Sequence, residues 1–169
     1  MQQWGGPAEG GRHPGAAVTA RPAPAARPLS SATPPLAALD SAPGVARGHV
    51  KATLAGWDLA GCTDTPILIA SELVSNAVEA SARAPFVVGV LVIRVCLITN
   101  GDLLTIECWD QAPGVPALRV VPELADRGRG LAIIDHLTGG AWGYRPAIGQ
   151  PGKCVWAVIP LRDAAARRS

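Results

Sequence analysis

Residues 67–80 of the chain read ILIASELVSNAVEA. At about 100° per residue, the apolar side chains of this stretch fall on one face, which predicts an amphipathic helix. Glu72, Asn76 and Glu79 are spaced one helical turn apart and form a polar line on the opposite face. The face that we expect to be buried consists of Ile67, Ala70, Leu73, Val74, Ala77 and Val78.

The polar line admits two interpretations. It is either the solvated side of an ordinary helix or part of a site that needs oxygen donors. The line contains no Lys or Arg, and Asn is a weak helix former, which favours the second interpretation. An amide oxygen can ligate Mg²⁺, and a carboxylate one turn away can accept a proton. Asn76 is therefore a candidate metal ligand, and Glu72 is a candidate general base.

Length and composition restrict the class of protein. With 169 residues, 49% of them hydrophobic, the chain suffices for one domain with a sizeable core. The net charge of +2 gives no argument for direct nucleic-acid binding, and no apolar run reaches the ~18 residues of a membrane span. The N-terminus has no apolar signal core, so we expect a cytoplasmic protein. The cysteines form no zinc-binding pattern, and we expect them to be reduced.

The chain divides into three segments. Residues 1–42 are rich in Pro, Gly and Ala, and we expect them to be disordered. Residues 43–161 form the predicted domain, and residues 162–169 form an Arg- and Ala-rich tail that we expect to fray.

Inside the domain, periodicity predicts the order of elements. A helix is expected at 44–57, before the central helix, with Val45, His49, Val50, Leu54 and Trp57 on one side. Extended residues 86–99 and 103–109 flank Asn100-Gly101, a strong hairpin signal. A two-residue turn there would place Cys96 opposite Thr105. A further helix follows residues 127–131, and the last two strands are expected at 141–145 and 153–160.

Two motifs outside the central helix carry candidate chemistry. Asp110 ends the second strand of the hairpin, where it either starts a turn or accepts a ligand's N–H donor at a sheet edge. Residues 127–131 read RGRGL and open a helix. Their glycines let a phosphate approach the backbone, and Arg129 could add positive charge, although many helices follow a glycine for steric reasons alone.

Taken together, these motifs resemble the ATP-binding domains of the GHKL superfamily, which includes gyrase, chaperone and histidine-kinase domains. Within it, the chain is most similar to the small anti-sigma-factor serine kinases. The resemblance covers residues 40–161. Its motifs are Ser71–Ala77, Asp110-x-x-x-Gly114, Arg127–Leu131 and Gly152–Trp156.

The resemblance implies an α/β (α+β) two-layer sandwich of the GHKL (Bergerat) type. Its helices would lie on one face of a mixed, mostly antiparallel sheet and hold ATP and Mg²⁺. It implies that Asn76 ligates Mg²⁺, that Glu72 is the general base, and that Asp110 accepts the adenine amino group. Residues 115–127 would correspond to the ATP lid. The residues implied to contact the nucleotide are Asn76, Asp110, Gly114, Gly128, Arg129, Gly130 and Leu131.

The resemblance also implies a function, with two departures in sequence. We expect a protein serine/threonine kinase that phosphorylates a small anti-sigma-factor antagonist, could also bind a sigma factor, and could form a homodimer. Ala112 and Pro113 stand where many members carry a glycine motif, and Cys154 stands at the expected position of a threonine near the adenine. The alternatives are a non-catalytic partner-binding module with a weakened nucleotide site, and an α/β domain whose motifs coincide by chance.

Overall fold

The computed structural model describes residues 28–84, 89–116 and 129–161. The helices are α1 (Ala42–Gly56), α2 (Asp64–Ala82) and α3 (Gly130–Thr138), with a short 3₁₀ helix at Ala60–Cys62. The strands are β1 (Leu29–Ala32), β2 (Leu36–Ala37), β3 (Val92–Thr99), β4 (Leu103–Asp110), β5 (Trp142–Pro146) and β6 (Lys153–Pro160).

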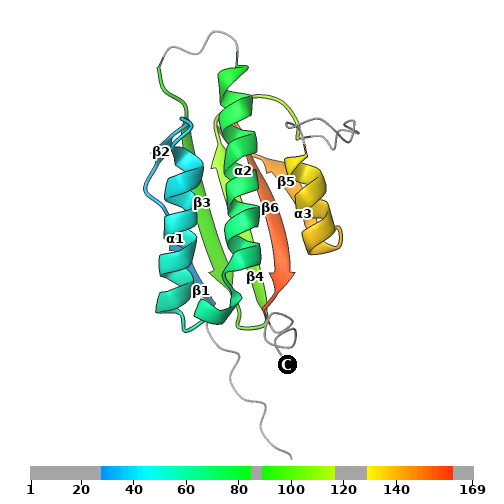
Figure 1. Cartoon of the computed structure of the whole chain (residues 1–169). Coiled ribbons are helices and arrows are strands. Elements are labelled where there is room, and N and C mark those ends of the chain that lie inside the picture. The colour runs from blue at the N-terminus through cyan, green and yellow to red at the C-terminus, as the bar shows by residue number, and fades with distance from the viewer. Residues whose placement is uncertain (1–27, 85–88, 117–128, 162–169) are drawn as a thin grey trace, which may run out of the picture.

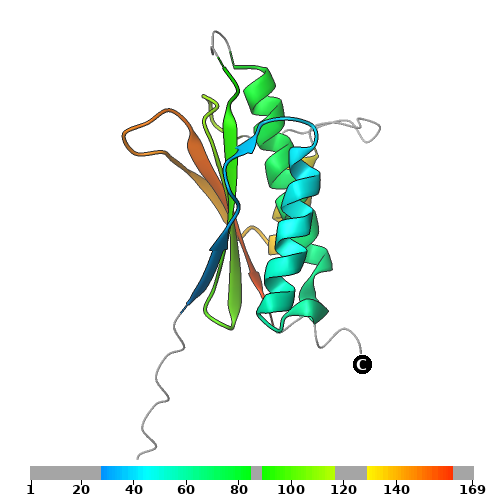
Figure 2. The same ribbon diagram turned by 90° about the vertical axis from the view of Figure 1, so that its left-hand side faces the viewer.

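The strands form one six-stranded sheet in the order β1–β3–β4–β6–β5, with β2 also paired to β3. The three α-helices lie on one face of this sheet, and the other face has no helix among the described residues (Figures 1 and 2). This arrangement confirms the expected two-layer α+β sandwich. We expected a mixed, mostly antiparallel sheet, but every described strand pair is antiparallel.

Helix α2 supplies the largest share of the helical side of the core. The helix expected at 67–80 is confirmed, and its buried residues follow the 3.6-residue period. Ile67 and Val78 from the expected face are only partly buried against the core. The fully or almost fully buried side chains of α2 are Ile69, Ala70, Leu73, Val74 and Ala77.

Strand β4 forms the centre of the sheet side of the core. Its side chains alternate as predicted: Leu104, Ile106 and Cys108 are buried beneath the helices. Thr105, Glu107 and Trp109 are only half-buried and alternate with them on the opposite face. We call this helix-free side the uncovered face of the sheet.

The β3–β4 connection differs from the expected two-residue turn. Thr99 pairs with Leu104, so Cys96 lies opposite Glu107 and not opposite Thr105. The Asn100 side-chain oxygen accepts hydrogen bonds from the backbone N–H groups of Asp102 and Leu103, at 3.0 and 2.9 Å. In a two-residue turn, backbone N–H groups at these positions would bond to the opposite strand. Here they bond to the Asn100 side chain, and the loop between the paired residues is longer.

The N-terminal boundary of the folded region also differs from the expectation. We expected residues 1–42 to be disordered, but residues 29–32 and 36–37 belong to the sheet. This segment has little apolar content of its own, and its pairing with β3 orders it. Residues 1–27 and 162–169 lie outside the described residues. Val45, expected on the buried side of α1, is 50% exposed. None of the described helices combines the length and apolar character needed to cross a membrane.

Candidate functional site

The polar line of α2 does not face open solvent along its whole length, because the first turn of α3 lies against it. A β-carbon at Gly130 would lie 2.8 Å from Glu72 Oε2 and 3.0 Å from Asn76 Oδ1. Real β-carbon atoms essentially never lie as close as 2.8 Å to a non-bonded heavy atom. A side chain at position 130 would force Glu72 or Asn76 to move, so glycine is the residue that lets the start of α3 lie this close to both side chains.

Asn76 has an unsatisfied polar group at this contact. Its Nδ2 atom is buried and has no hydrogen-bond partner among the described residues. A buried polar group without a partner costs about 1–3 kcal/mol, so a bound ligand, ion or water that satisfies it is a physical explanation for its presence. The sequence placed Asn76 in the site, but the lack of a partner is visible only in the structure.

Glu72 places its carboxylate against the same first turn of α3. Burial raises the pKa of Glu72 above its ordinary value of 4.5, and the neighbouring charge of Glu79 raises it further. Glu79 itself pairs with Arg83 at 2.8 Å on the exposed part of the helix. The two acidic residues of the polar line thus have different environments: Glu72 is at the α2–α3 contact, and Glu79 belongs to a surface ion pair.

The N-terminus of α3 has backbone donors without a capping side chain. Arg129 is the N-cap residue, its carbonyl accepts from the N–H of Ile133, and no side-chain cap is formed. The N–H groups of the first turn have no partner inside the helix, and they favour an anion. Leu131 is 8% exposed and packs in the core, so its only group suited to a polar ligand is its backbone N–H. Gly128 lies outside the described residues.

Asp110 is buried, and its carboxylate already has protein partners. Its side chain is 1% exposed, and Oδ1 accepts from Lys153 Nζ at 2.8 Å and from the Ala112 N–H at 2.9 Å. The Ala112 bond is the turn-forming interaction that the sequence allowed. Asp110 ends β4, as expected, and β4 lies in the interior of the sheet between β3 and β6.

Lys153, a residue of the Gly152–Trp156 motif to which we had assigned no role, is the side chain next to Asp110. It pairs with Asp110 across β4 and β6, whereas Cys154 pairs with Trp109 on the uncovered face. Cys154, which we expected near the adenine, therefore lies on the face of the sheet opposite to Asp110, because successive residues of a strand point to opposite faces. The only warning in the sequence was a lysine inside an otherwise apolar strand.

Gly152 makes this pairing possible. Its φ is +114°, and a β-carbon there would collide with the carbonyl oxygen of Asp110. The start of β6 can therefore approach the end of β4 only if residue 152 has no side chain.

The described site residues gather toward one end of the sandwich. β4 ends, β6 begins and α3 begins toward the same end of the molecule, where the C-terminal half of α2 also lies (Figure 1). Direct contacts link Glu72 and Asn76 to Gly130, and link Asp110 to Lys153. Gly114 is an exposed turn residue with φ +97°, beyond the end of β4.

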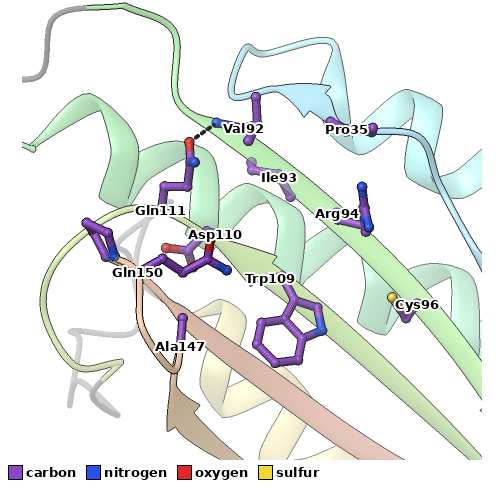
Figure 3. A pocket seen from close by; sticks show the side chains of 11 residues that line it. Pro35, Val92, Ile93, Arg94, Cys96, Trp109, Asp110, Gln111, Ala147 and Gln150 are labelled. Atoms are coloured by element: carbon purple, nitrogen blue, oxygen red, sulfur yellow. Dashed lines mark hydrogen bonds between the residues drawn. The ribbon is translucent and has the colours of Figure 1, made fainter.

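A separate groove of about 390 Å³ lies over the sheet and the β5–β6 hairpin (Figure 3). Arg94, Trp109 and Gln150 line it, whereas no residue of α2 or α3 does. Gln111, also at the groove, accepts a hydrogen bond from the Val92 N–H at 3.0 Å. Only Asp110 is shared with the residues that we assigned to the nucleotide. The groove is thus not the α2–α3 site.

Comparison with protein-family models and with curated protein sequences identifies no match. Within residues 28–84, 89–116 and 129–161, no three His, Cys, Asp or Glu side chains come together as a metal-binding group. All four cysteines have free thiols. The candidate site is therefore defined by two α2 side chains, the start of α3, and the Asp110–Lys153 pair.

Proposed function

We propose that the chain is an ATP-dependent protein serine/threonine kinase of the anti-sigma-factor type, with its phosphate site between α2 and α3. One observation carries this proposal: Gly130 brings the uncapped start of α3 against Glu72 and the unpartnered amide of Asn76. A carboxylate, an amide and the backbone N–H groups at a helix N-terminus are groups suited to binding and transferring a phosphate.

The donor set at this contact fits Mg²⁺. Magnesium keeps several waters and takes one or two protein oxygens together with substrate phosphates, so a cluster of three acidic side chains is not needed. Asn76 would be the ligand, through its amide oxygen. When bound, Mg²⁺ would neutralise charge on the triphosphate and orient it.

Glu72 would act as the general base toward a serine or threonine hydroxyl of the protein substrate. The hydroxyl oxygen would bond to the γ-phosphorus of ATP while its proton passes to the Glu72 carboxylate, and the bond to the β–γ bridging oxygen would break to release ADP. A pKa raised by burial suits this role, because it brings the carboxyl closer to the pH at which it must accept a proton.

The substrate class rests on the resemblance alone. The small anti-sigma-factor serine kinases phosphorylate an antagonist protein, so we assign a small anti-sigma-factor antagonist as the substrate and a sigma factor as a possible second partner.

Calorimetric titration of the purified protein with ATP, with and without Mg²⁺, tests the nucleotide site. We expect saturable binding that depends on Mg²⁺. The absence of binding at millimolar ATP would overturn the proposal. An assay of phosphate transfer from ATP to a candidate antagonist would then test the proposed kinase activity.

A second candidate function is a partner-binding module whose nucleotide site has been weakened. The Asp110–Lys153 ion pair favours it, because the carboxylate assigned to adenine is buried and already accepts two hydrogen bonds from the protein. In that case the chain would bind its partner equally well with and without ATP, and no phosphate would be transferred.

A further inference from the structure

Lys153 is a buried cation in a position where the fold alone does not require one. Its side chain is 8% exposed and donates to Asp110 Oδ1 at 2.8 Å and to the Ala112 carbonyl oxygen at 3.1 Å. Lysine is almost never buried unless it is paired. A buried ion pair is also weak support for stability, because apolar residues of similar volume often do as well or better.

The geometry of the pair is one-sided. Both hydrogen bonds that Asp110 receives within the described residues end on Oδ1, and none ends on Oδ2. Ala112 and Lys153 are also joined to each other, so Asp110 is held by two groups that fix its orientation. One carboxylate oxygen thus accepts both hydrogen bonds, and no hydrogen bond from a described residue ends on the other.

We propose that Lys153 is a positioning residue that keeps Asp110 an oriented hydrogen-bond acceptor, and that the site thereby selects purine nucleotides carrying a 6-amino group. This inference rests on the proposed nucleotide-binding function. It adds the reason for base selection and the residue that enforces it.

The charges around Asp110 support this assignment. Burial raises the pKa of Asp110, whereas the Lys153 ammonium and the Ala112 N–H act against that rise. Among the residues that the structure describes, the thiols of Cys108 and Cys154 also interact electrostatically with Asp110. Burial raises the pKa of Cys154 to about 12 and that of Cys108 well above 9.0, so both stay neutral in the physiological range. Among the described residues, Lys153 is therefore the cation that favours the ionised form of Asp110.

The ionisation state decides which base fits. A carboxylate can only accept, so it pairs with the adenine amino group and disfavours the 6-oxo group of hypoxanthine. A protonated carboxyl also has an O–H donor, which can bond to that 6-oxo group. Loss of Lys153 would therefore remove the discrimination between adenine and hypoxanthine nucleotides at any pH at which Asp110 is protonated.

Calorimetric titration with ATP and with ITP, which differ at this purine group, tests the inference. The wild-type protein should bind ATP at least about tenfold more tightly than ITP at both about pH 6 and about pH 8. For Lys153→Met the ratio should fall to within about threefold at the lower pH and recover as the pH rises, because loss of the ammonium raises the pKa of Asp110 further. Lys51→Met, which removes an exposed lysine from α1, should behave like the wild type.

A second variant covers the case in which Lys153→Met does not fold. Asp110→Asn combined with Lys153→Met removes both buried charges, and it should bind ATP and ITP about equally at every pH, because an amide both donates and accepts. A wild-type ATP preference that persists in either variant would overturn the role of Lys153 and leave the proposed function intact. Failure of the wild type to bind either nucleotide would overturn the proposed function, and the base-selection role with it.

Discussion

Gly130 and Glu72 are so close that a β-carbon at position 130 would lie 2.8 Å from Glu72 Oε2. The residues are 58 positions apart in the printed sequence, and their proximity is what joins α2 and α3 into one candidate site. Close packing at Gly130 explains the glycine sterically, and it also places backbone donors where a phosphate would need them. The two interpretations of the glycine motif are therefore compatible.

Gly130→Ala should lower the free energy of unfolding by about 1–3 kcal/mol, because the new methyl group must displace Glu72, Asn76 or α3. It should also abolish ATP binding in the proposed site. Urea unfolding and calorimetry measure the two effects. Gly48→Ala is the matched control, since Gly48 is exposed within α1 and has open space around it. That change should stabilise the protein by about 0.5–1 kcal/mol. Equal stability of both variants would contradict the close contact at Gly130.

Asn76→Ala should abolish Mg²⁺-dependent ATP binding with little loss of stability. The reason is that the substitution removes an amide whose Nδ2 has no partner, so no hydrogen bond to Nδ2 is lost. Calorimetry with and without Mg²⁺, together with urea unfolding, gives both quantities. A large loss of stability combined with normal Mg-ATP binding would show that Asn76 is a structural residue.

Glu72→Gln should retain ATP binding but reduce phosphate transfer by a factor of about 10²–10⁴, the usual contribution of a general base. In the wild type, transfer should rise with pH through the raised pKa of Glu72, because the carboxylate is the active form. Radiolabelled transfer to a candidate antagonist, followed over pH, provides the measurement. Unchanged transfer by the variant would remove Glu72 from the mechanism.

The same substitution has a separate effect on stability. Because burial raises the folded-state pKa of Glu72 above its ordinary value of 4.5, the native state binds the proton more tightly than the unfolded chain. Ionisation therefore costs stability as the pH rises from 4.5 through the raised pKa. Glu72→Gln should thus gain stability relative to the wild type over that interval, and the gain should be constant above it. A stability difference that does not change with pH would argue against the raised pKa.

Gly152→Ala should destabilise the protein by more than about 3 kcal/mol, because its φ is +114° and the methyl group would collide with the Asp110 carbonyl. Gly149→Ala is the control in the same hairpin. Its φ is +74° but it has open space, so it should cost only about 1–2 kcal/mol. Thermal unfolding separates backbone strain, which both variants have, from the collision, which only Gly152→Ala has.

Much of the secondary structure was predictable because it depends on local periodicity. The helical spacing of α2 and the alternation of Leu104, Ile106 and Cys108 in β4 are both present in the order of residues. The β3–β4 register was not predictable from Asn100-Gly101, because the Asn100 side chain bonds two backbone N–H groups of the loop. Strands β1 and β2 were missed since they depend on β3 for their pairing.

The candidate site divides in the same way. The sequence by itself determined that Glu72 and Asn76 lie one helical turn apart on the polar side of an amphipathic helix, because helical geometry makes near neighbours in sequence into neighbours in space. Tertiary structure decided that Gly130 packs against both side chains, and that Lys153, not Cys154, meets Asp110. Those contacts join residues that are far apart in the chain, so they depend on how α3 docks on α2 and on the register between β4 and β6.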